Sequence, residues 1–333
     1  MDYRKLIAES WGYTQSHKSL IRWFGFLPAL FTTTVGAWYI FYQFFAFKTS
    51  WIFDDAKDSF FEEMIGIVWG FITEHVSWTV PLVIFGIFFF ITYMLLPTIA
   101  RAGAIQAIAR NRNGQEAGAG TGLRYGIMSF LPLLEYHLII KTFAFFSILI
   151  EMSFVVRNLG PVIFQFLLPV FIILIFLSIF LTLLFTFTDF FIVIDDDGVF
   201  ESMKKSAKLV ITHWKHTFLI TLLMIIIGLR IVIQAVLVFL IPALVVFLMG
   251  YLTTLAFTSA AIIYVVGGVV GGVGLILSAY LNGIVDIFAY AVWTFAFLDL
   301  TAEQEIGARD AVPEIKDDIK TDPDHNYEGH KNL

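Results

Sequence analysis

Long runs of apolar residues constrain what this chain can fold into more than any other feature. The clearest run covers residues 217–247 and contains a single charge, Arg230. A run of roughly 18 or more apolar residues is typical of a helix that crosses a bilayer, because a helix satisfies its own backbone hydrogen bonds within hydrocarbon. Only 14% of the 333 residues are charged, against about 25% in soluble domains. The sequence therefore predicts an all-α, polytopic integral membrane protein.

The apolar runs predict about six transmembrane helices within one transmembrane domain, residues 1–300. The expected spans are 20–46, 78–100, 134–156, 161–193, 217–247 and 266–299. Residues 250–265 are also apolar, and counting them as a further span gives seven. We favour six, with 250–265 as a short re-entrant or outer-interface helix, because residues 50–74 occupy the same place in the first hairpin. Residues 301–333 are acidic and almost lack apolar side chains, so we expect a disordered cytoplasmic tail.

Three segments share one plan, in which an amphipathic helix leads through a polar, histidine-containing junction into a span. The junction histidines are His17, His137 and the pair His213 and His216. The plan predicts three hairpins of two spans, each preceded by an amphipathic helix at the membrane interface, of which residues 2–19 form the first. It indicates either an internal repeat or the interface helix that any chain with an even number of spans shows before its odd-numbered spans.

Lysine and arginine gather on alternate sides of the expected spans. Residues 1–22, 101–124 and 204–215 each hold four of them, whereas the segments between hold two or fewer. Cytoplasmic loops of membrane proteins carry this excess of positive charge. The pattern therefore predicts a plasma-membrane protein whose N-terminus and, with six spans, C-terminus lie in the cytoplasm.

Charges inside the spans indicate either helix contacts or functional sites, since placing one in a bilayer costs about 2.5–3.5 kcal/mol. Arg230 and Asp286 lie at similar expected depths, about 20 Å from the cytoplasmic ends of their spans. Gln234 and Asn282 lie one turn away on the same faces. These four residues are the candidate intramembrane polar site, which is either a clasp between two helices or a site of binding or transport. Three further charges are expected to snorkel, cap a helix or pair locally: Lys141, Glu151 and Asp189.

Motifs for catalysis, metals and cofactors are not evident. The chain has no cysteine, which excludes disulfides and thiolate ligands. Asp195, Asp196 and Asp197 could offer oxygen ligands to a divalent cation. We favour a local role, in which these acids complement the N-terminus of the helix expected over 199–213. We expect no cofactor, no metal and no nucleic-acid partner; membrane lipids and other membrane proteins are the expected contacts.

One resemblance to known proteins rests on the stretch IDDDGVFESMKKSAKLVITHWKHTFLI. It resembles a segment of a broad group of prokaryotic multi-span proteins, which includes the membrane domain of glycerophosphoryl diester phosphodiesterase and several uncharacterised families. The end YAVWTFAFLDLTAEQE and the opening SHKSLIRWFGFL are similar to the same group. The resemblance covers residues 1–306 and implies six helices in a prokaryotic plasma membrane. It implies no phosphodiesterase activity, because a separate soluble domain carries catalysis in that enzyme.

Three functions are compatible with these features. The first is a non-enzymatic structural or accessory membrane component. The second is a small transporter or channel that uses the polar site of Arg230 and Asp286. The third is a lipid-handling enzyme, which has the least support because no set of residues with catalytic spacing is present.

Overall fold

Every element of the computed structural model is a helix within the residues that it describes, 2–48, 60–141, 143–229 and 260–311. This confirms the predicted all-α class. The helices are α1 (Tyr3–Ser16), α2 (Lys18–Leu20), the π-helix η1 (Ile21–Phe26), α3 (Leu27–Lys48), α4 (Phe60–Glu74), α5 (Val76–Arg112), α6 (Ala119–Met128), α7 (Phe130–Lys141), α8 (Phe145–Asn158), α9 (Gly160–Leu184), α10 (Thr188–Ile194), α11 (Val199–Thr212), the helix Trp214–Leu229 and α13 (Ala260–Ala311).

Four helical segments of the described ranges are long and apolar enough to cross a membrane. They are Lys18–Tyr39, Val76–Arg112, Gly160–Ile194 and Gly271–Glu303. A fifth is obtained if α11 and the helix Trp214–Leu229, which are bent by 97° relative to each other, count as one broken span. The described chain therefore has the helices of a membrane-embedded protein, with four to five candidate spans.

Several boundaries differ from the expected ones. Two helices, α7 and α8, take the place of the single helix expected over 134–156. The Lys- and Arg-rich segment 101–124 is largely helical, because α5 continues to Arg112 and α6 follows. α13 runs unbroken over 52 residues, so it joins 260–265 to the expected last span and continues into the expected tail. Residues 250–259 and 312–333 lie outside the described residues, and the division into a domain and a disordered tail stays a prediction.

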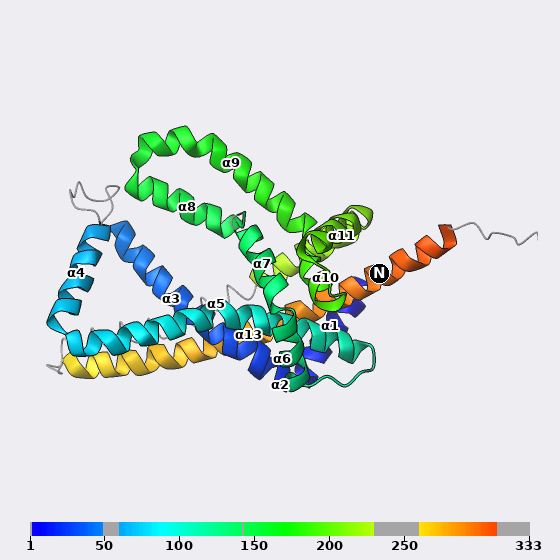
Figure 1. Ribbon diagram of the computed structural model, residues 1–333, viewed down its shortest axis with the longest axis horizontal. Coiled ribbons are helices and arrows are strands. Elements are labelled where there is room, and N and C mark those ends of the chain that lie inside the picture. Colours follow the sequence, from blue (N-terminus) through cyan, green and yellow to red (C-terminus); the bar gives the residue numbers. More distant parts are fainter. Residues whose placement is uncertain (1, 49–59, 142, 230–259, 312–333) are drawn as a thin grey trace, which may run out of the picture.

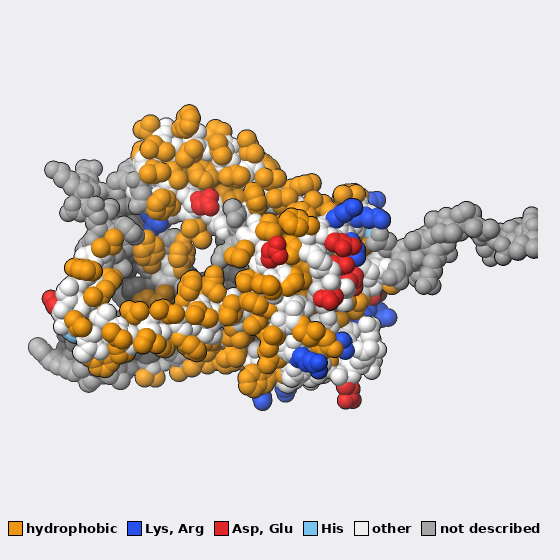
Figure 2. All heavy atoms as spheres, in the orientation of Figure 1, with side chains coloured by type: hydrophobic (Ala, Val, Ile, Leu, Met, Phe, Trp, Pro, Cys, Tyr) orange, Lys and Arg blue, Asp and Glu red, His pale blue; other side chains and the backbone are white. Residues whose placement is uncertain are grey.

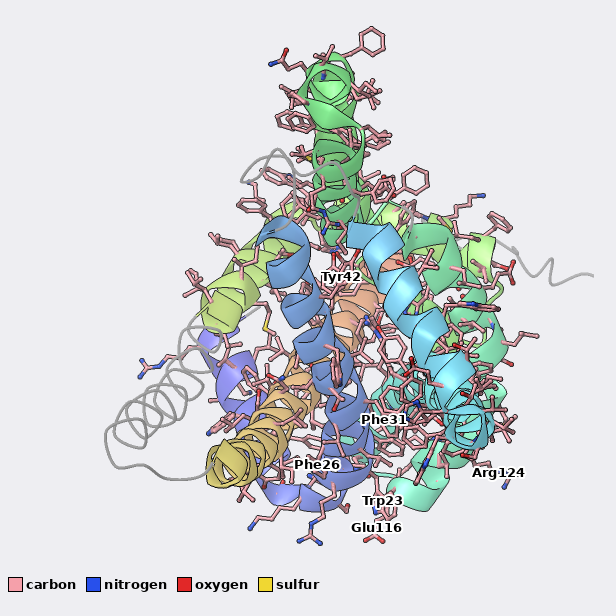
Figure 3. The ribbon with its side chains drawn as sticks, turned by 90° about the vertical axis from the view of Figure 1, so that its left-hand side faces the viewer. Trp23, Phe26, Phe31, Tyr42, Glu116 and Arg124 are labelled. Atoms are coloured by element: carbon pink, nitrogen blue, oxygen red, sulfur yellow. The ribbon has the colours of Figure 1, made fainter. Side chains whose placement is uncertain are left out.

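The helices converge on one end of the molecule, which we call the compact end. It is built by α1, α2, η1, α6, α10, α11 and the C-terminal halves of α5 and α13 (Figure 1). From it, α3, α4, α5 and α13 extend to one side, and the pair α8 and α9 extends separately (Figure 1). Phe31 of α3 packs against Phe89 of α5, with ring centroids 5.2 Å apart (Figure 3).

Apolar and charged side chains separate between the two ends. Acidic and basic side chains gather at the compact end, and apolar ones cover the extended helices (Figure 2). Val80, Phe85 and Phe88 of α5 and Phe166 of α9 are each more than half exposed. Soluble monomers rarely expose apolar surface this extensive. Such a surface is compatible with a membrane-embedded protein.

The compact end has two apolar cores that share α5 and α13. One core packs α1 and η1 against these helices through Leu6, Phe24, Ile108 and Val292. The other packs α7, α10 and α11 against them, with Phe297 at its centre among the rings of Phe187, Phe190 and Phe191; the core residues further include Ile105, Leu133, Leu209 and Leu300. α5 and α13 therefore contact most other helices of the compact end, and they carry several of the polar side chains described below.

Candidate functional site

Arg101, Asp189 and His137 form the most buried charged cluster among the described residues. The side chain of Asp189, in α10, is only 4% exposed. It makes an ion pair with the Nη2 atom of Arg101 in α5, and its Oδ1 atom lies 3.4 Å from Nε2 of His137 in α7. Three helices far apart in the sequence therefore meet at one carboxylate.

A break between α9 and α10 places Asp189 at this position. The turn at Phe185–Phe187 ends α9, and Ser206 of α11 holds the turn. The Ser206 hydroxyl donates to the carbonyl of Leu184 at 3.0 Å and accepts from the backbone N–H of Phe187 at 3.1 Å. Since both backbone groups lie where helical bonding is interrupted, Ser206 fixes the direction in which α10 leaves the turn.

α13 contributes the aromatic and acidic side of the cluster. The guanidinium carbon of Arg101 lies 5.6 Å from the centre of the Tyr290 ring. Asp286 lies one turn before Tyr290 and interacts electrostatically with Arg101. Arg101 thus pairs with the carboxylate of Asp189 on α10 and also interacts electrostatically with Asp286 on α13.

The residues of the candidate polar site are only partly within the described ranges. Asn282 lies in α13 and donates from Nδ2 to the Thr33 hydroxyl of α3 at 3.1 Å. Asp286 lies one turn further along and interacts electrostatically with Arg101. Arg230 and Gln234 lie outside the described residues, so the pairing of Arg230 with Asp286 stays a prediction.

Sequence reasoning assigned Arg101 to a loop and therefore missed its role. The run ARAGAIQAIARNR that begins at Ala100 has no helix-breaking pair before Asn113 and Gly114. Its alanines favour continuation of the preceding helix. This alanine-rich run could therefore have predicted that the preceding helix continues and that Arg101 lies on it.

A groove of about 370 Å³ lies beside Arg101. It is open between α3, α5 and α7, and its lining residues are Thr32, Tyr93, Met94, Pro97, Thr98, Arg101, Leu134, His137, Leu138 and Ile140. The side chains of Arg101 and His137 are 36% and 30% exposed, whereas Asp189 is covered. The two nitrogen-bearing side chains are therefore accessible from the groove, and the carboxylate is not.

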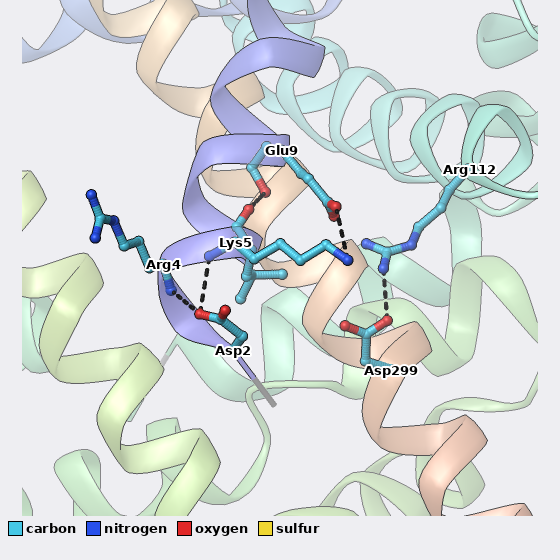
Figure 4. A network of polar contacts seen from close by, with 8 residues as sticks. Asp2, Arg4, Lys5, Glu9, Arg112 and Asp299 are labelled. Carbon is cyan, nitrogen blue, oxygen red and sulfur yellow. Dashed lines mark hydrogen bonds and ion pairs between the residues drawn. The ribbon is translucent and has the colours of Figure 1, made fainter.

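A second ion pair joins α5 to α13 nearer the end of both helices. Arg112 Nη2 lies 2.7 Å from Asp299 Oδ1, and its guanidinium carbon lies 4.2 Å from the centre of the Phe295 ring. Figure 4 shows this pair beside α1, where Lys5 and Glu9 face each other at 3.7 Å. Like the pair of Arg101 and Asp189, it connects segments that are remote in sequence.

The acidic run before α11 is engaged locally. Asp197 accepts two hydrogen bonds from Lys205 Nζ, at 2.7 and 2.8 Å. Asp196 has a positive φ of 58°, which marks the sharp turn into α11. Within the described part of the chain, no group of three or more acidic or histidine side chains could hold a metal ion.

Comparison of the chain with protein-family models, with curated proteins and with solved structures finds no match. The resemblance to the prokaryotic multi-span group therefore stays a prediction. The arrangement of helices and charges is what bears on function.

Proposed function

We propose that this protein is a structural or accessory component of a prokaryotic plasma membrane, without catalytic activity of its own. The observation that carries the proposal is the use of charge at the compact end. Arg101 with Asp189, and Arg112 with Asp299, each join helices that are distant in sequence. Both pairs tie α5 to a neighbouring helix, which is what a rigid scaffold requires.

The geometry of the buried pair supports a structural role. Removing one partner of a buried ion pair typically costs about 3–5 kcal/mol, because the other charge is left without compensation. Asp189 of α10 is buried beside α5 and α7, and His137 supplies a second nitrogen to it. A carboxylate held in this way stabilises the meeting point of the three helices.

A small transporter or channel is the second candidate. The observation that favours it is the position of Asp286, which interacts with Arg101 and lies on the same helix as Asn282. Polar and charged side chains that follow one helix through a membrane commonly mark an ion or proton pathway. In this alternative, Arg230 would be the partner of Asp286 further along that pathway.

Reconstitution into lipid vesicles distinguishes the two functions. The purified protein is incorporated into vesicles, and proton and potassium flux are measured under an applied potential, with thermal unfolding followed in parallel. A scaffold gives no flux above that of protein-free vesicles, while Asp189→Asn lowers the unfolding temperature. The matched control is Glu116→Gln, since Glu116 is exposed at the surface (Figure 3).

Flux that Asp286→Asn abolishes, at an unchanged unfolding temperature, would overturn the proposal in favour of transport. Unchanged stability in Asp189→Asn would also overturn it, because the ion pair would then not hold the helices together.

A further inference from the structure

The groove beside Arg101 combines features that the scaffold role does not use. It has apolar walls from Met94, Leu134 and Leu138, hydroxyl groups from Thr98 and Tyr93, and the partly exposed side chains of Arg101 and His137. We infer that it binds the phosphate-bearing head of an anionic phospholipid, with one acyl chain lying along the outer surface of α5. The inference is independent of whether the protein is a scaffold or a transporter.

The level of the groove matches that of lipid headgroups. Arg101 lies about 25 residues after Val76, the first residue of α5, which corresponds to a rise of about 38 Å. The hydrocarbon core of a bilayer is about 30 Å thick. A helix that begins at one face of the membrane therefore brings Arg101 to the polar layer of the opposite face.

The positively charged side of the site lies toward the groove, and the negatively charged side is buried, which suits the binding of an anion. Asp189 is buried behind Arg101 and His137, whose side chains are accessible from the groove. The Nε atom of Arg101 has no hydrogen-bond partner among the described residues. This Nε atom is itself buried, so a phosphate oxygen would accept from the accessible part of the guanidinium, while the pair with Asp189 keeps the guanidinium in place.

The walls of the groove suit the glycerol backbone and the start of an acyl chain. Pro97 lies inside α5 and has no N–H, so the carbonyl of Tyr93 lacks its usual helical donor and is available to a ligand hydroxyl. Beyond the groove, Ile87, Phe88 and Ile91 are about half exposed or more along α5. A volume of about 370 Å³ is at the small end of ligand pockets, so it holds a headgroup and not a whole lipid.

Native mass spectrometry of the full-length protein in detergent tests the inference. The probes are dioleoyl phosphatidylglycerol, dioleoyl phosphatidylcholine, sn-glycerol 3-phosphate and inorganic phosphate. Two groove variants are compared with wild type: the double variant Arg101→Gln with Asp189→Asn, which removes the cation without leaving a charge unpaired, and Leu134→Trp, which fills the groove and keeps both charges. The control is Arg124→Gln, since Arg124 lies on α6 (Figure 3) and is not among the lining residues of the groove.

Wild type and Arg124→Gln are expected to bind phosphatidylglycerol equally, and at least tenfold more tightly than the other three probes. Both groove variants are expected to lose at least tenfold in that affinity; if the double variant does not fold, Leu134→Trp decides. Equal affinity for phosphatidylcholine, or unchanged binding in the folded groove variants, overturns the inference. Glycerol phosphate or inorganic phosphate binding as tightly as the lipid also overturns it and indicates a soluble anion.

Discussion

Asp189 shows how burial changes what a single carboxylate does. In the sequence it lies near the end of an apolar run, where a helix cap or a snorkelling side chain is expected. In the fold it is buried where three helices meet and faces Arg101 and His137. A buried charge is tolerated only when its partners are fixed in place. The stability of the compact end is therefore expected to be sensitive to this residue.

Asp189→Asn is expected to lower the free energy of unfolding by about 2 kcal/mol, because it leaves the guanidinium of Arg101 without its counter-charge. The cost is below the roughly 3–5 kcal/mol of a fully buried pair because the Arg101 side chain is 36% exposed. Thermal unfolding in detergent measures the change. The double variant Arg101→Met with Asp189→Leu should recover much of the loss, since no charge is then unpaired. A double variant less stable than Arg101→Met alone and Asp189→Leu alone would contradict this account.

The pair of Arg112 and Asp299 is more accessible, with side chains 26% and 37% exposed. Water screens such a pair, so its coupling is expected to be about 0.5–1 kcal/mol. A double-mutant cycle with Arg112→Ala and Asp299→Ala, followed by thermal unfolding, measures it. The coupling should shrink in high salt; a salt-independent value above about 2 kcal/mol would mean that the pair is effectively buried.

Packing between helices depends on glycines at two positions of close approach. Gly25 of η1 lies against Gly283 of α13: a Cβ atom on Gly283 would lie 2.8 Å from the Cα atom of Phe26. The π-helical turn of η1 widens the backbone at this point. The contact holds the first candidate span against the last one.

Gly283→Ala is expected to destabilise the protein by about 2 kcal/mol or more, because two backbones must separate to admit the methyl group. The control is Gly12→Ala in α1, where no described atom lies within 4 Å of the added carbon. That change should stabilise by about 0.5–1 kcal/mol through helix propensity. Equal unfolding temperatures for the two variants would contradict the close approach of η1 and α13.

Helix boundaries show which features of the fold the sequence patterns predict and which they do not. Apolar runs located α5, α9 and most of α13, because a bilayer requires long helices whatever their neighbours are. The same runs did not separate α7 from α8 or α9 from α10. Those breaks are supported by contacts from elsewhere, such as the hydroxyl of Ser206. Glycines in an apolar run commonly allow close helix packing, yet Gly271, Gly272 and Gly274 of α13 have no described atom within 4 Å of an added Cβ.

The orientation of the protein in the membrane follows from its charge distribution and stays a prediction. The chain has no native cysteine, so single cysteines can be labelled without background. An impermeant maleimide should modify Glu74→Cys from outside intact cells, and Gln115→Cys and Asn332→Cys only after permeabilisation. External labelling of Asn332→Cys, with Gln115→Cys still protected, would favour seven spans over six. External labelling of Gln115→Cys would show that the orientation is the reverse of the predicted one.

The sequence by itself determined that this is an all-α protein with several membrane-length helices. Unpaired backbone N–H and C=O groups are costly in a bilayer, so long apolar runs form helices, which pair these groups internally. It also predicted that lysine and arginine gather on one side of the membrane. Only the tertiary structure decided which charges meet. Arg101, His137 and Asp189 come from three separate helices, and no local pattern encodes their contact, since it depends on how α5, α7 and α10 pack. The groove and the proposed lipid site are consequences of that packing.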